Sequence, residues 1–360
     1  MNINDLLKVA VENKASDLHL KVGTPPVLRI DGDLRPLPEL TRLMQEDVTA
    51  MAFSIMGARQ KQRFQDELEI DISYSVPGLG RFRCAVFQQR SKVGMVARVI
   101  PSRIFNLREL NLPPVLETVC ERRRGLVLCT GTTGSGKSTT LAAMVNQINM
   151  TRNEHIVTIE DPIEYVHRDR RSLVSQRELE VDTHSFGSAL RASLRQDPDV
   201  ILLGERRDFE TIETAMLAAE TGHLVFSTLH TLDATETITR LVSVFPPHHQ
   251  QQVRLQLSQV LQAVISMRLV PRADGSGRVP ATEVMIVTPY IRECIEVKEK
   301  TKFIRDQIVQ GTSQYGMQTF DQSLFQLYKS GLITLDHALK GATNLDEFRL
   351  KLEGIQLTSD

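Results

Sequence analysis

Alternating polar and apolar positions are the clearest pattern near the start of the chain. Over residues 69–76 every second side chain is apolar, residues 77–80 (Pro-Gly-Leu-Gly) reverse the chain, and the alternation then resumes. This pattern predicts a β-hairpin with a loop longer than two residues. Helical spacing over residues 47–56 and a strand-like run over residues 94–100 flank the hairpin. We therefore expect a small α+β domain.

Further along the chain, apolar runs of strand length alternate with helical periodicity. Residues 125–130, 155–159 and 199–203 have the length and composition of buried strands, and residues 137–149 have helical spacing. Strands that alternate with helices predict a parallel sheet covered by helices on both faces. The expected fold class is therefore α/β.

Proline and apolar spacing also predict how the chain is divided. The small domain is placed at residues 1–100, and prolines mixed with isolated apolar residues mark residues 101–113 as a linker or hinge. The α/β core is placed at residues 114–290. Residues 291–360 have mostly helical patterns and are expected to form a helical C-terminal region.

Composition and charge exclude several classes of protein. The 360 residues carry 43 Lys and Arg against 44 Asp and Glu, a formal net charge of −1, and 41% are hydrophobic. These values are typical of a folded protein of about two domains. Without a basic excess, and with only 5% aromatic residues on which bases stack, the chain is not expected to bind nucleic acid.

The expected location of the chain is the cytoplasm. Its N-terminal residues carry charges at helical spacing instead of an apolar signal sequence, and no run approaches the ~18 apolar residues of a membrane span. Any membrane association is thus expected to pass through a partner, without direct insertion. Cys84, Cys120, Cys129 and Cys294 form no Cys-x-x-Cys pair, so we expect reduced, buried thiols.

A phosphate-binding loop is the strongest chemical signal in the sequence. Residues 131–138 match G-x-x-x-x-G-K-[ST] between a predicted strand and a predicted helix, a context that disfavours a glycine-rich turn without a ligand. Lys137 is expected to reach the β- and γ-phosphates of ATP, and Ser138 to bind Mg²⁺. The expected nucleotide contacts are Gly131, Thr133, Gly134, Ser135, Gly136, Lys137, Ser138 and Thr139.

Two acidic segments are expected beside this loop, because each follows a predicted strand. Glu205 ends an apolar run, where a Walker B acid would orient the attacking water; its alternative role is the N-cap of a helix that begins at Asp208. Residues 160–164 follow another strand and offer Glu164 for water-mediated contact with Mg²⁺. A solvated turn shaped by Pro162 is the alternative for that segment.

Histidines and arginines supply the remaining candidates. His223 and His230 bracket a strand-like run and are candidate γ-phosphate sensors, although isolated histidines near strands more often have no catalytic role. Arg81, Arg83 and Arg98 face away from the apolar side of their strands. Exposed arginines are usually solvated, but one of these could stabilise phosphate charge at a neighbouring subunit's site.

Together, the loop, the acidic segment, Glu205 and the two histidines resemble the secretion ATPase superfamily, and within it the PilT-type retraction ATPases of type IV pili. The resemblance extends along nearly the whole chain and includes residues 16–20 and 316–321. It implies a RecA-like ATPase core, an N-terminal PAS-like domain and a homo-hexameric ring with ATP and Mg²⁺ between subunits. It raises Arg81, Arg83 and Arg98 as groups that act in trans.

The resemblance also implies a partner and a direction of work. The implied role is pilus retraction through an inner-membrane platform protein, with the ATPase peripheral at the inner membrane. Residues 267–275 contain no cysteine, whereas extension ATPases carry a tetracysteine zinc insertion there. The retraction helix motif Ala-Ile-Arg-Asn-Leu-Ile is altered to Tyr-Ile-Arg-Glu-Cys-Ile at residues 290–295. An accessory PilU-type ATPase, which works with paralogous pilus ATPases, and a nucleotide-gated scaffold are the alternatives.

Overall fold

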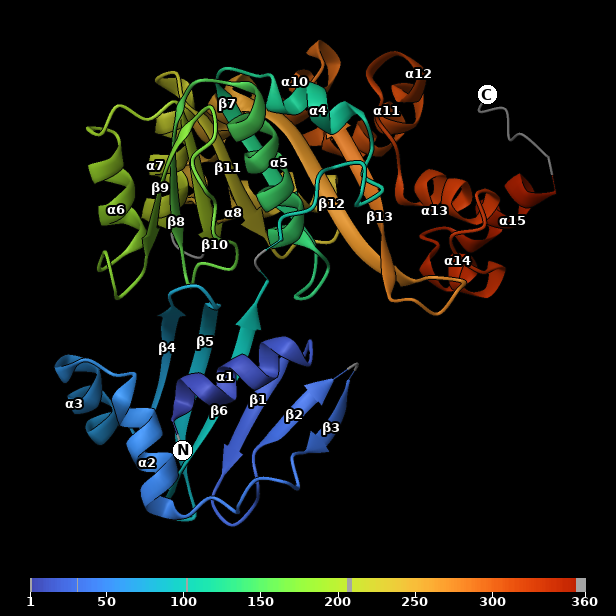
Figure 1. Cartoon of the computed structure of the whole chain (residues 1–360). Coiled ribbons are helices and arrows are strands. Elements are labelled where there is room, and N and C mark those ends of the chain that lie inside the picture. Colours follow the sequence, from blue (N-terminus) through green and yellow to red (C-terminus); the bar gives the residue numbers. More distant parts are fainter. Residues whose placement is uncertain (1, 31, 102, 206–208, 354–360) are drawn as a thin grey trace. The chain divides into compact units, whose positions relative to one another are not determined.

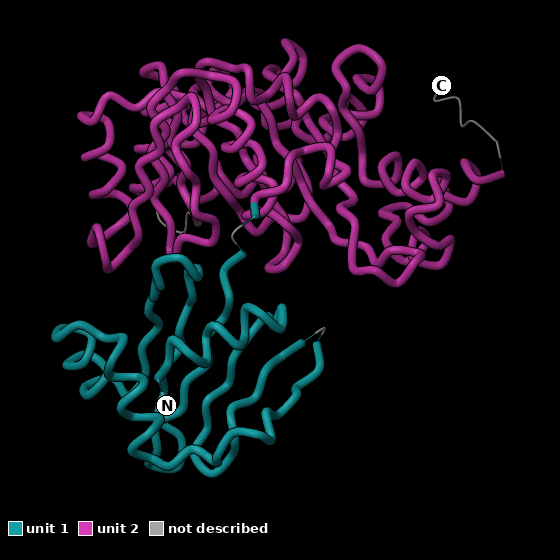
Figure 2. Tube along the Cα trace, in the orientation of Figure 1, with its two compact units in different colours: residues 1–103 teal, residues 104–360 magenta. Residues whose placement is uncertain are grey.

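The chain divides into two compact units, each with its own sheet and core. The computed structural model describes residues 2–30, 32–101, 103–205 and 209–353, with the side chain of Glu205 left out. Unit 1 is Met1–Arg103 and unit 2 is Ile104–Asp360 (Figure 2). None of the helices in these described ranges is both long and apolar enough to cross a membrane.

The described residues of unit 1 form a six-stranded antiparallel sheet with three helices (Figure 1). The strand order is β3-β2-β1-β6-β5-β4. Its strands are β1 (Asp17–Lys21), β2 (Val27–Ile30), β3 (Asp33–Pro36), β4 (Glu69–Val76), β5 (Gly80–Gln89) and β6 (Lys92–Ile100). Its helices are α1 (Ile3–Glu12), α2 (Gln45–Ser54) and α3 (Ala58–Glu67).

The predicted hairpin is confirmed as β4 and β5. Val76 pairs with Gly80, so the turn lies between them as the Pro-Gly-Leu-Gly sequence predicted. Phe82 and Cys84 are fully buried because alternate residues of β5 point into the core of unit 1. The sequence analysis did not predict β1 to β3, whose short runs alternate less regularly.

Unit 2 is built on a seven-stranded sheet whose order is β13-β12-β7-β11-β10-β8-β9. Every neighbouring pair is parallel except β12 and β13. Its strands are β7 (Gly125–Thr130), β8 (His155–Glu160), β9 (Leu173–Glu178), β10 (Val200–Glu205), β11 (Leu224–Leu229), β12 (Leu261–Pro271) and β13 (Arg278–Ile286). The predicted parallel α/β domain is therefore confirmed.

Helices on both faces bury the centre of this sheet. Every residue of β7 and β11 is buried, and both strands are apolar except near their carboxyl ends, where Thr130, Ser227 and Thr228 are polar. Figure 1 shows α5 in front of the strands. The α-helices of unit 2 up to the last strand are α4 (Val115–Cys120), α5 (Lys137–Thr151), α6 (Phe186–Ser193), α7 (Phe209–Glu220), α8 (Ala234–Ser243) and α9 (Gln250–Val260).

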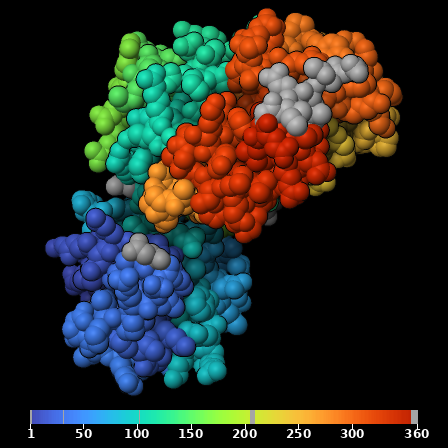
Figure 3. Space-filling view, turned by 90° about the vertical axis from the view of Figure 1, so that its right-hand side faces the viewer, coloured from blue at the N-terminus to red at the C-terminus, as the bar shows by residue number. Residues whose placement is uncertain are grey.

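The C-terminal residues form helices with a separate small core. That core joins Val270 and Val279, from the far ends of β12 and β13, to Phe320 and Phe348. Figure 3 shows the surface of this region in orange and red. Its α-helices are α10 (Pro289–Glu296), α11 (Ile304–Gln310), α12 (Thr312–Tyr315), α13 (Phe320–Lys329), α14 (Leu335–Gly341) and α15 (Leu345–Leu352).

The predicted linker, residues 101–113, is only partly a connector. Leu107 and Leu112 are 3% and 6% exposed and belong to the main core of unit 2. Two anchored leucines fix the second half of the segment to unit 2, because each would lose its apolar contacts if the backbone swung away. Residues 107 to 112 therefore belong to the packed part of unit 2.

Candidate nucleotide-binding site

The loop of residues 131–138 joins β7 to α5 and is shaped by three glycines. Gly131, Gly134 and Gly136 have φ values of 137°, 76° and 100°, a region that L side chains rarely adopt. Ser135 is 3% exposed, and its Oγ has no hydrogen-bond partner among the described residues. A buried hydroxyl of this kind needs a partner, which a phosphate oxygen can supply. The loop therefore fits a nucleotide.

Lys137 places its charge at the centre of this loop. Its Nζ donates to the carbonyl oxygens of Gly131 and Thr132 at 2.8 and 2.9 Å, and the residue is only 9% exposed. The ammonium group and the N-terminus of α5 both bring positive charge to the loop. This combination is a strong electrostatic site for an anion.

We predict that two glycines of the loop respond very differently to alanine. A Cβ on Gly131 would lie 2.6 Å from the backbone oxygen of Met267, whereas a Cβ on Gly134 would meet no atom within 4 Å. Gly131→Ala should therefore lower the free energy of unfolding by about 3 kcal/mol or more, and Gly134→Ala by about 1–2 kcal/mol. Urea denaturation measures both values, and equal losses would contradict the close approach to Met267.

Strand order brings the sequence motifs to one edge of the sheet. β7, β11, β10 and β8 are consecutive and parallel, so their carboxyl ends, which we call the carboxyl edge, lie together. His230 follows Leu229, which pairs with Thr130 immediately before the loop. Thr228 Oγ1 also donates to the carbonyl oxygen of Gly204 at 2.8 Å. The edge thus collects the loop, His230, and the ends of β8 and β10.

Glu160 is the most strongly perturbed acid at this edge. Its Oε1 accepts hydrogen bonds from Thr158 Oγ1 at 2.6 Å and from Gln176 Nε2 at 3.2 Å. Burial nevertheless raises the pKa of Glu160 from 4.5 to about 7, because desolvation penalises the carboxylate more than these bonds favour it. The negative charge of Glu164 adds to the rise, although its backbone N–H opposes it.

The acidic segment contacts the first turn of α5 through a residue that the sequence analysis missed. Tyr165 OH lies 2.8 Å from Thr139 Oγ1, one residue after Ser138. Glu164 itself is exposed. Its neighbour Tyr165 therefore ties the segment to the loop, while the Glu164 carboxylate stays open to water. Nothing in the local sequence pattern singles out this tyrosine.

We predict a pH-dependent stability difference at Glu160. Because its pKa is raised, the folded chain holds a proton that the unfolded chain releases between pH 4.5 and 7, so this group costs stability as pH rises. Glu160→Gln cannot ionise and should gain of the order of 2–3 kcal/mol relative to the parent between pH 5 and pH 8. Thermal denaturation across that range tests this, with the exposed Glu213→Gln as control for removal of one negative charge. A Glu160→Gln difference that is flat with pH would contradict it.

Glu205 is the last residue of β10, at the carboxyl edge as expected. Its side chain and residues 206–208 lie outside the described part of the chain, so neither the Walker B role of Glu205 nor its alternative role as a helix N-cap is tested. Within the described residues, no group of three His, Cys, Asp or Glu side chains is placed to hold a metal ion. Mg²⁺ is commonly held through one or two protein groups, phosphate oxygens and water, which the half-buried Ser138 and the exposed Glu164 fit.

The structure does not bring His223 to the loop, contrary to the expectation that both histidines sense phosphate. His223 precedes β11, and its carbonyl oxygen accepts from the backbone N–H of Gly125 at the start of β7. It lies at the opposite, amino edge of the sheet, seven residues or about 23 Å along the strand from His230. Because His223 and His230 lie at opposite ends of β11, their side chains cannot reach the same phosphate within one subunit.

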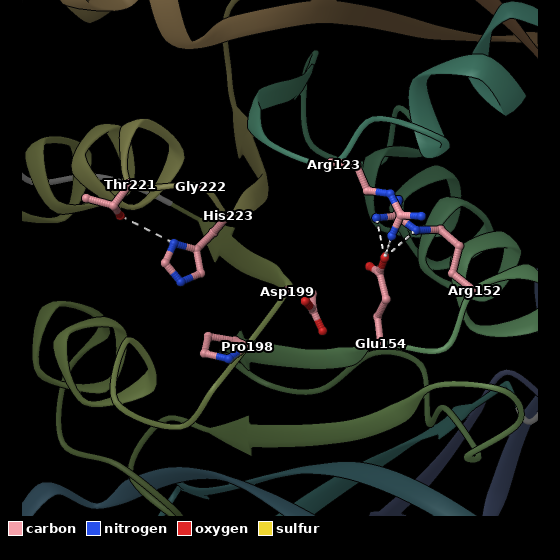
Figure 4. Close-up of a pocket in the computed structure, with 8 residues that line it drawn as sticks. All are labelled: Arg123, Arg152, Glu154, Pro198, Asp199, Thr221, Gly222 and His223. Atoms are coloured by element: carbon pink, nitrogen blue, oxygen red, sulfur yellow. Dashed lines mark hydrogen bonds and ion pairs between the residues drawn. The ribbon is translucent and has the colours of Figure 1, made fainter.

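His223 instead lines a polar cavity of about 260 Å³ at the amino edge (Figure 4). Its Nδ1 lies 2.9 Å from the carbonyl oxygen of Ala218. Figure 4 shows Asp199 between His223 on one side and Glu154 on the other, with two arginines directed at the Glu154 carboxylate. The imidazole is therefore held by the end of α7. It faces the polar cavity at the amino edge and not the phosphate loop.

The three candidate arginines of unit 1 share one face of its sheet. Arg83 pairs across the strands with Arg98, and Arg81 lies two residues before Arg83 on β5. Arg83 forms an ion pair with Asp71, and Arg98 with Asp17, both at 3.0 Å. Both arginines remain partly exposed, at 41% and 65%. The face is therefore basic, with acids of its own unit that orient two of its guanidinium groups.

Similarity to known proteins extends over almost the whole chain. The family described as Type II/IV secretion system protein matches residues 1–326. The type IV pilus retraction ATPase PilT of Pseudomonas aeruginosa is 48% identical, over 97% of this chain and 100% of that protein. The type IV pilus ATPase PilU of the same organism is 40% identical, over 98% and 92%.

Solved structures agree with the sequence relatives. The crystal structure of the pilus retraction motor PilT with bound ADP superposes with a TM-score of 0.90 at 47% identity, and covers 96% of this chain and 98% of that one. The Legionella pneumophila ATPase DotB superposes with a TM-score of 0.80 at 27% identity, covering 98% and 96%. The two units, the sheet and the loop described above thus have counterparts of known structure.

Proposed function

The chain belongs to the type II/IV secretion system protein family, and on that premise we propose that it is the ATPase that powers retraction of a type IV pilus. The end-to-end match to a retraction ATPase, 48% identical over 100% of that protein, carries this conclusion. The chain is an ATPase with a RecA-like core, as the sequence predicted. A relative crystallised with ADP supports nucleotide use at residues 131–138.

Each group at the carboxyl edge has a proposed task. Lys137 and the backbone N–H groups of the loop hold the β- and γ-phosphates, and Ser138 binds Mg²⁺, which neutralises charge on the phosphates when bound. Glu205 orients the attacking water, and Glu164 reaches the water bound to the metal. His230 donates a hydrogen bond near the γ-phosphate, because it directly follows Leu229, which pairs with Thr130 immediately before the loop.

We further propose that the working form is a homo-hexameric ring at the inner membrane. In such a ring Arg81, Arg83 or Arg98 of one subunit stabilises the transferring phosphate of the next and adds positive charge to that of Lys137. The load is the base of the pilus, reached through an inner-membrane platform protein. The residues before Leu107 absorb the change in backbone angles when a subunit closes on nucleotide.

Counting surface pili on cells that lack the gene tests the proposed function. Retraction predicts excess pili that do not retract, and complementation by the parental gene but not by Lys137→Ala restores the normal number. Bald cells would show that the chain extends pili and would overturn the proposal.

An accessory, PilU-type role is the second candidate. The altered residues 290–295, where α10 carries Tyr-Ile-Arg-Glu-Cys-Ile, favour it, although the accessory relative is less similar, at 40% against 48% identity. An accessory ATPase predicts unchanged pilus numbers when a paralogous motor is intact. A nucleotide-gated scaffold predicts in addition no phosphate release by the purified protein.

A further inference from the structure

Three short segments of unit 2 meet at the amino edge of the sheet, opposite the phosphate loop. Arg152 NH1 donates to the carbonyl oxygens of Cys120 and Arg122 at 2.6 and 2.8 Å, which joins the turn after α4 to the end of α5. Asn149 accepts from the backbone N–H of Arg171 at 3.0 Å, which adds the segment before β9. Residues 120–124, 149–154 and 168–173 thus form one surface, which we call the arginine surface.

This surface is strongly basic on a chain that is nearly neutral. Its three segments carry seven arginines, three carboxylates and no lysine, whereas the whole chain has a net charge of −1. The arginines are Arg122, Arg123, Arg124, Arg152, Arg168, Arg170 and Arg171. All of them except Arg152 are exposed. Four positive charges in excess on one edge need an anionic partner or remain mutually repulsive.

Three of the arginines form side-chain contacts within the fold, and one of them, Arg171, makes only a hydrogen bond from its Nε to Asn153 Oδ1 at 3.2 Å. Arg123 and Arg152 both bind Oε1 of Glu154, a carboxylate that is 4% exposed (Figure 4). Arg152 also satisfies the last carbonyl groups of α4, as expected of a cation at a helix C-terminus. By contrast, the side chains of Arg122, Arg124, Arg168 and Arg170 form no ion pair with any residue that the structure describes.

Two exposed apolar side chains belong to the same segments as these arginines. Met150, in the last turn of α5, is 51% exposed, and Leu173 is 56% exposed. The backbone N–H of Leu173 donates to the backbone carbonyl oxygen of Glu154 at 2.9 Å, which joins the start of β9 to the segment that carries Arg152 and Glu154. Cations interspersed with exposed apolar side chains are the pattern of a surface that contacts lipid headgroups and the upper acyl chains.

The residue types distinguish a membrane from other anions. Guanidinium groups bind phosphate in a bidentate manner, and lysine, which is absent from these segments, does not. The segments contain no aromatic residue on which a nucleic acid base would stack. A soluble phosphate would bury no apolar surface of the exposed Met150 and Leu173, whereas a bilayer would bury both side chains and so favour binding.

We propose that the arginine surface binds an anionic phospholipid bilayer directly. Each arginine near such a surface strengthens binding about fivefold at physiological salt, and the attraction decays within a Debye length of about 8 Å. This inference goes beyond the proposed function. The ATPase would then have two attachments to the membrane, one through the platform protein and one directly through lipid. The lipid contact does not depend on ATP turnover.

Sedimentation with lipid vesicles tests this contact. The full-length protein should sediment with vesicles of phosphatidylglycerol and phosphatidylcholine, and remain in solution with phosphatidylcholine alone. Replacing Arg168, Arg170 and Arg171 with Gln should weaken partitioning about 100-fold. A matched triple variant of exposed arginines outside the surface, Arg240→Gln with Arg278→Gln and Arg349→Gln, removes the same charge and should keep most of the binding.

Two further variants separate the contributions of charge and apolar contact. Leu173→Ser should lower vesicle binding several-fold and leave folding intact, because the side chain is already more than half exposed. Raising the salt concentration to 0.5 M should weaken the parent far more than the Arg168, Arg170 and Arg171 variant. ATP turnover should be unchanged in all of these variants, since the surface lies at the edge away from Lys137.

Several outcomes would overturn the proposal. Equal binding of the two triple variants would show that net charge alone attracts the vesicle. Binding of poly-glutamate without binding of anionic vesicles would assign the surface to an acidic protein. Elution of the Arg168, Arg170 and Arg171 variant as a smaller oligomer than the parent would assign it to subunit contacts.

Discussion

Replacing Lys137 with Ala is expected to lower ATP turnover by about 10²–10³-fold or more, the cost of removing one preorganised group that stabilises transition-state charge. Its Nζ is held 2.8 and 2.9 Å from two carbonyl oxygens of the loop, so the ammonium is already in place before a phosphate arrives. Nucleotide affinity should fall as well, because the same charge attracts the ground-state phosphates. Phosphate release under saturating ATP, together with nucleotide titration, measures both effects.

Two controls make this expectation specific. Lys329→Ala removes an exposed lysine in α13, far along the chain from the loop, and should leave turnover at the parental rate. Lys137→Arg should be nearly as inactive as Lys137→Ala, because a planar guanidinium cannot replace a compact ammonium that is buried in the loop. Turnover of Lys137→Ala within threefold of the parent would remove residues 131–138 from the catalytic site.

The parts of the fold that local chemistry determines were predictable from the sequence. Positive φ at Gly131, Gly134 and Gly136 is what a loop that curls around phosphate requires, and glycine adopts it without a steric cost. The boundaries of β7 agree with the predicted residues 125–130 because its apolar run stops where that loop begins. The hairpin of β4 and β5 was predictable for the same reason, since alternation and turn residues both act within a few positions.

Contacts between distant segments were not predictable in this way. The strands β12 and β13 escaped the sequence analysis because α9 ends at Val260 and β12 begins at Leu261, with no glycine or proline to mark the change. The contact between Tyr165 and Thr139 depends on how β8 and α5 are placed by the sheet. The same topology places His223 and His230 at opposite edges of the sheet, and a sequence pattern does not tell which edge a residue reaches.

If an arginine of unit 1 acts on the neighbouring subunit's site, a second large effect is expected. It is the recovery of ATP turnover in rings assembled from two inactive variants. Arg81→Ala alone should lower turnover about 10³-fold if it supplies the charge in trans, and Glu205→Gln alone should lower turnover about 10²–10⁴-fold through loss of the group that orients water. Each variant keeps the group that the other lacks. A ring that contains both therefore holds some sites with an intact Glu205 and an intact Arg81 from the neighbour.

Random assembly of the two variants in equal amounts should restore about a quarter of the parental turnover, because half of the subunits carry Glu205 and half of their neighbours carry Arg81. Recovery should follow the product of the two fractions as the mixing ratio is varied. Arg83→Ala and Arg98→Ala serve as comparisons, because Arg83 and Arg98 are the other two candidates on the same face of the sheet. If no ratio of the Arg81 and Glu205 variants restores turnover while either comparison does, the trans arginine is the one whose variant complements. If none of the three complements, each site is complete within one subunit and the shared-site mechanism fails.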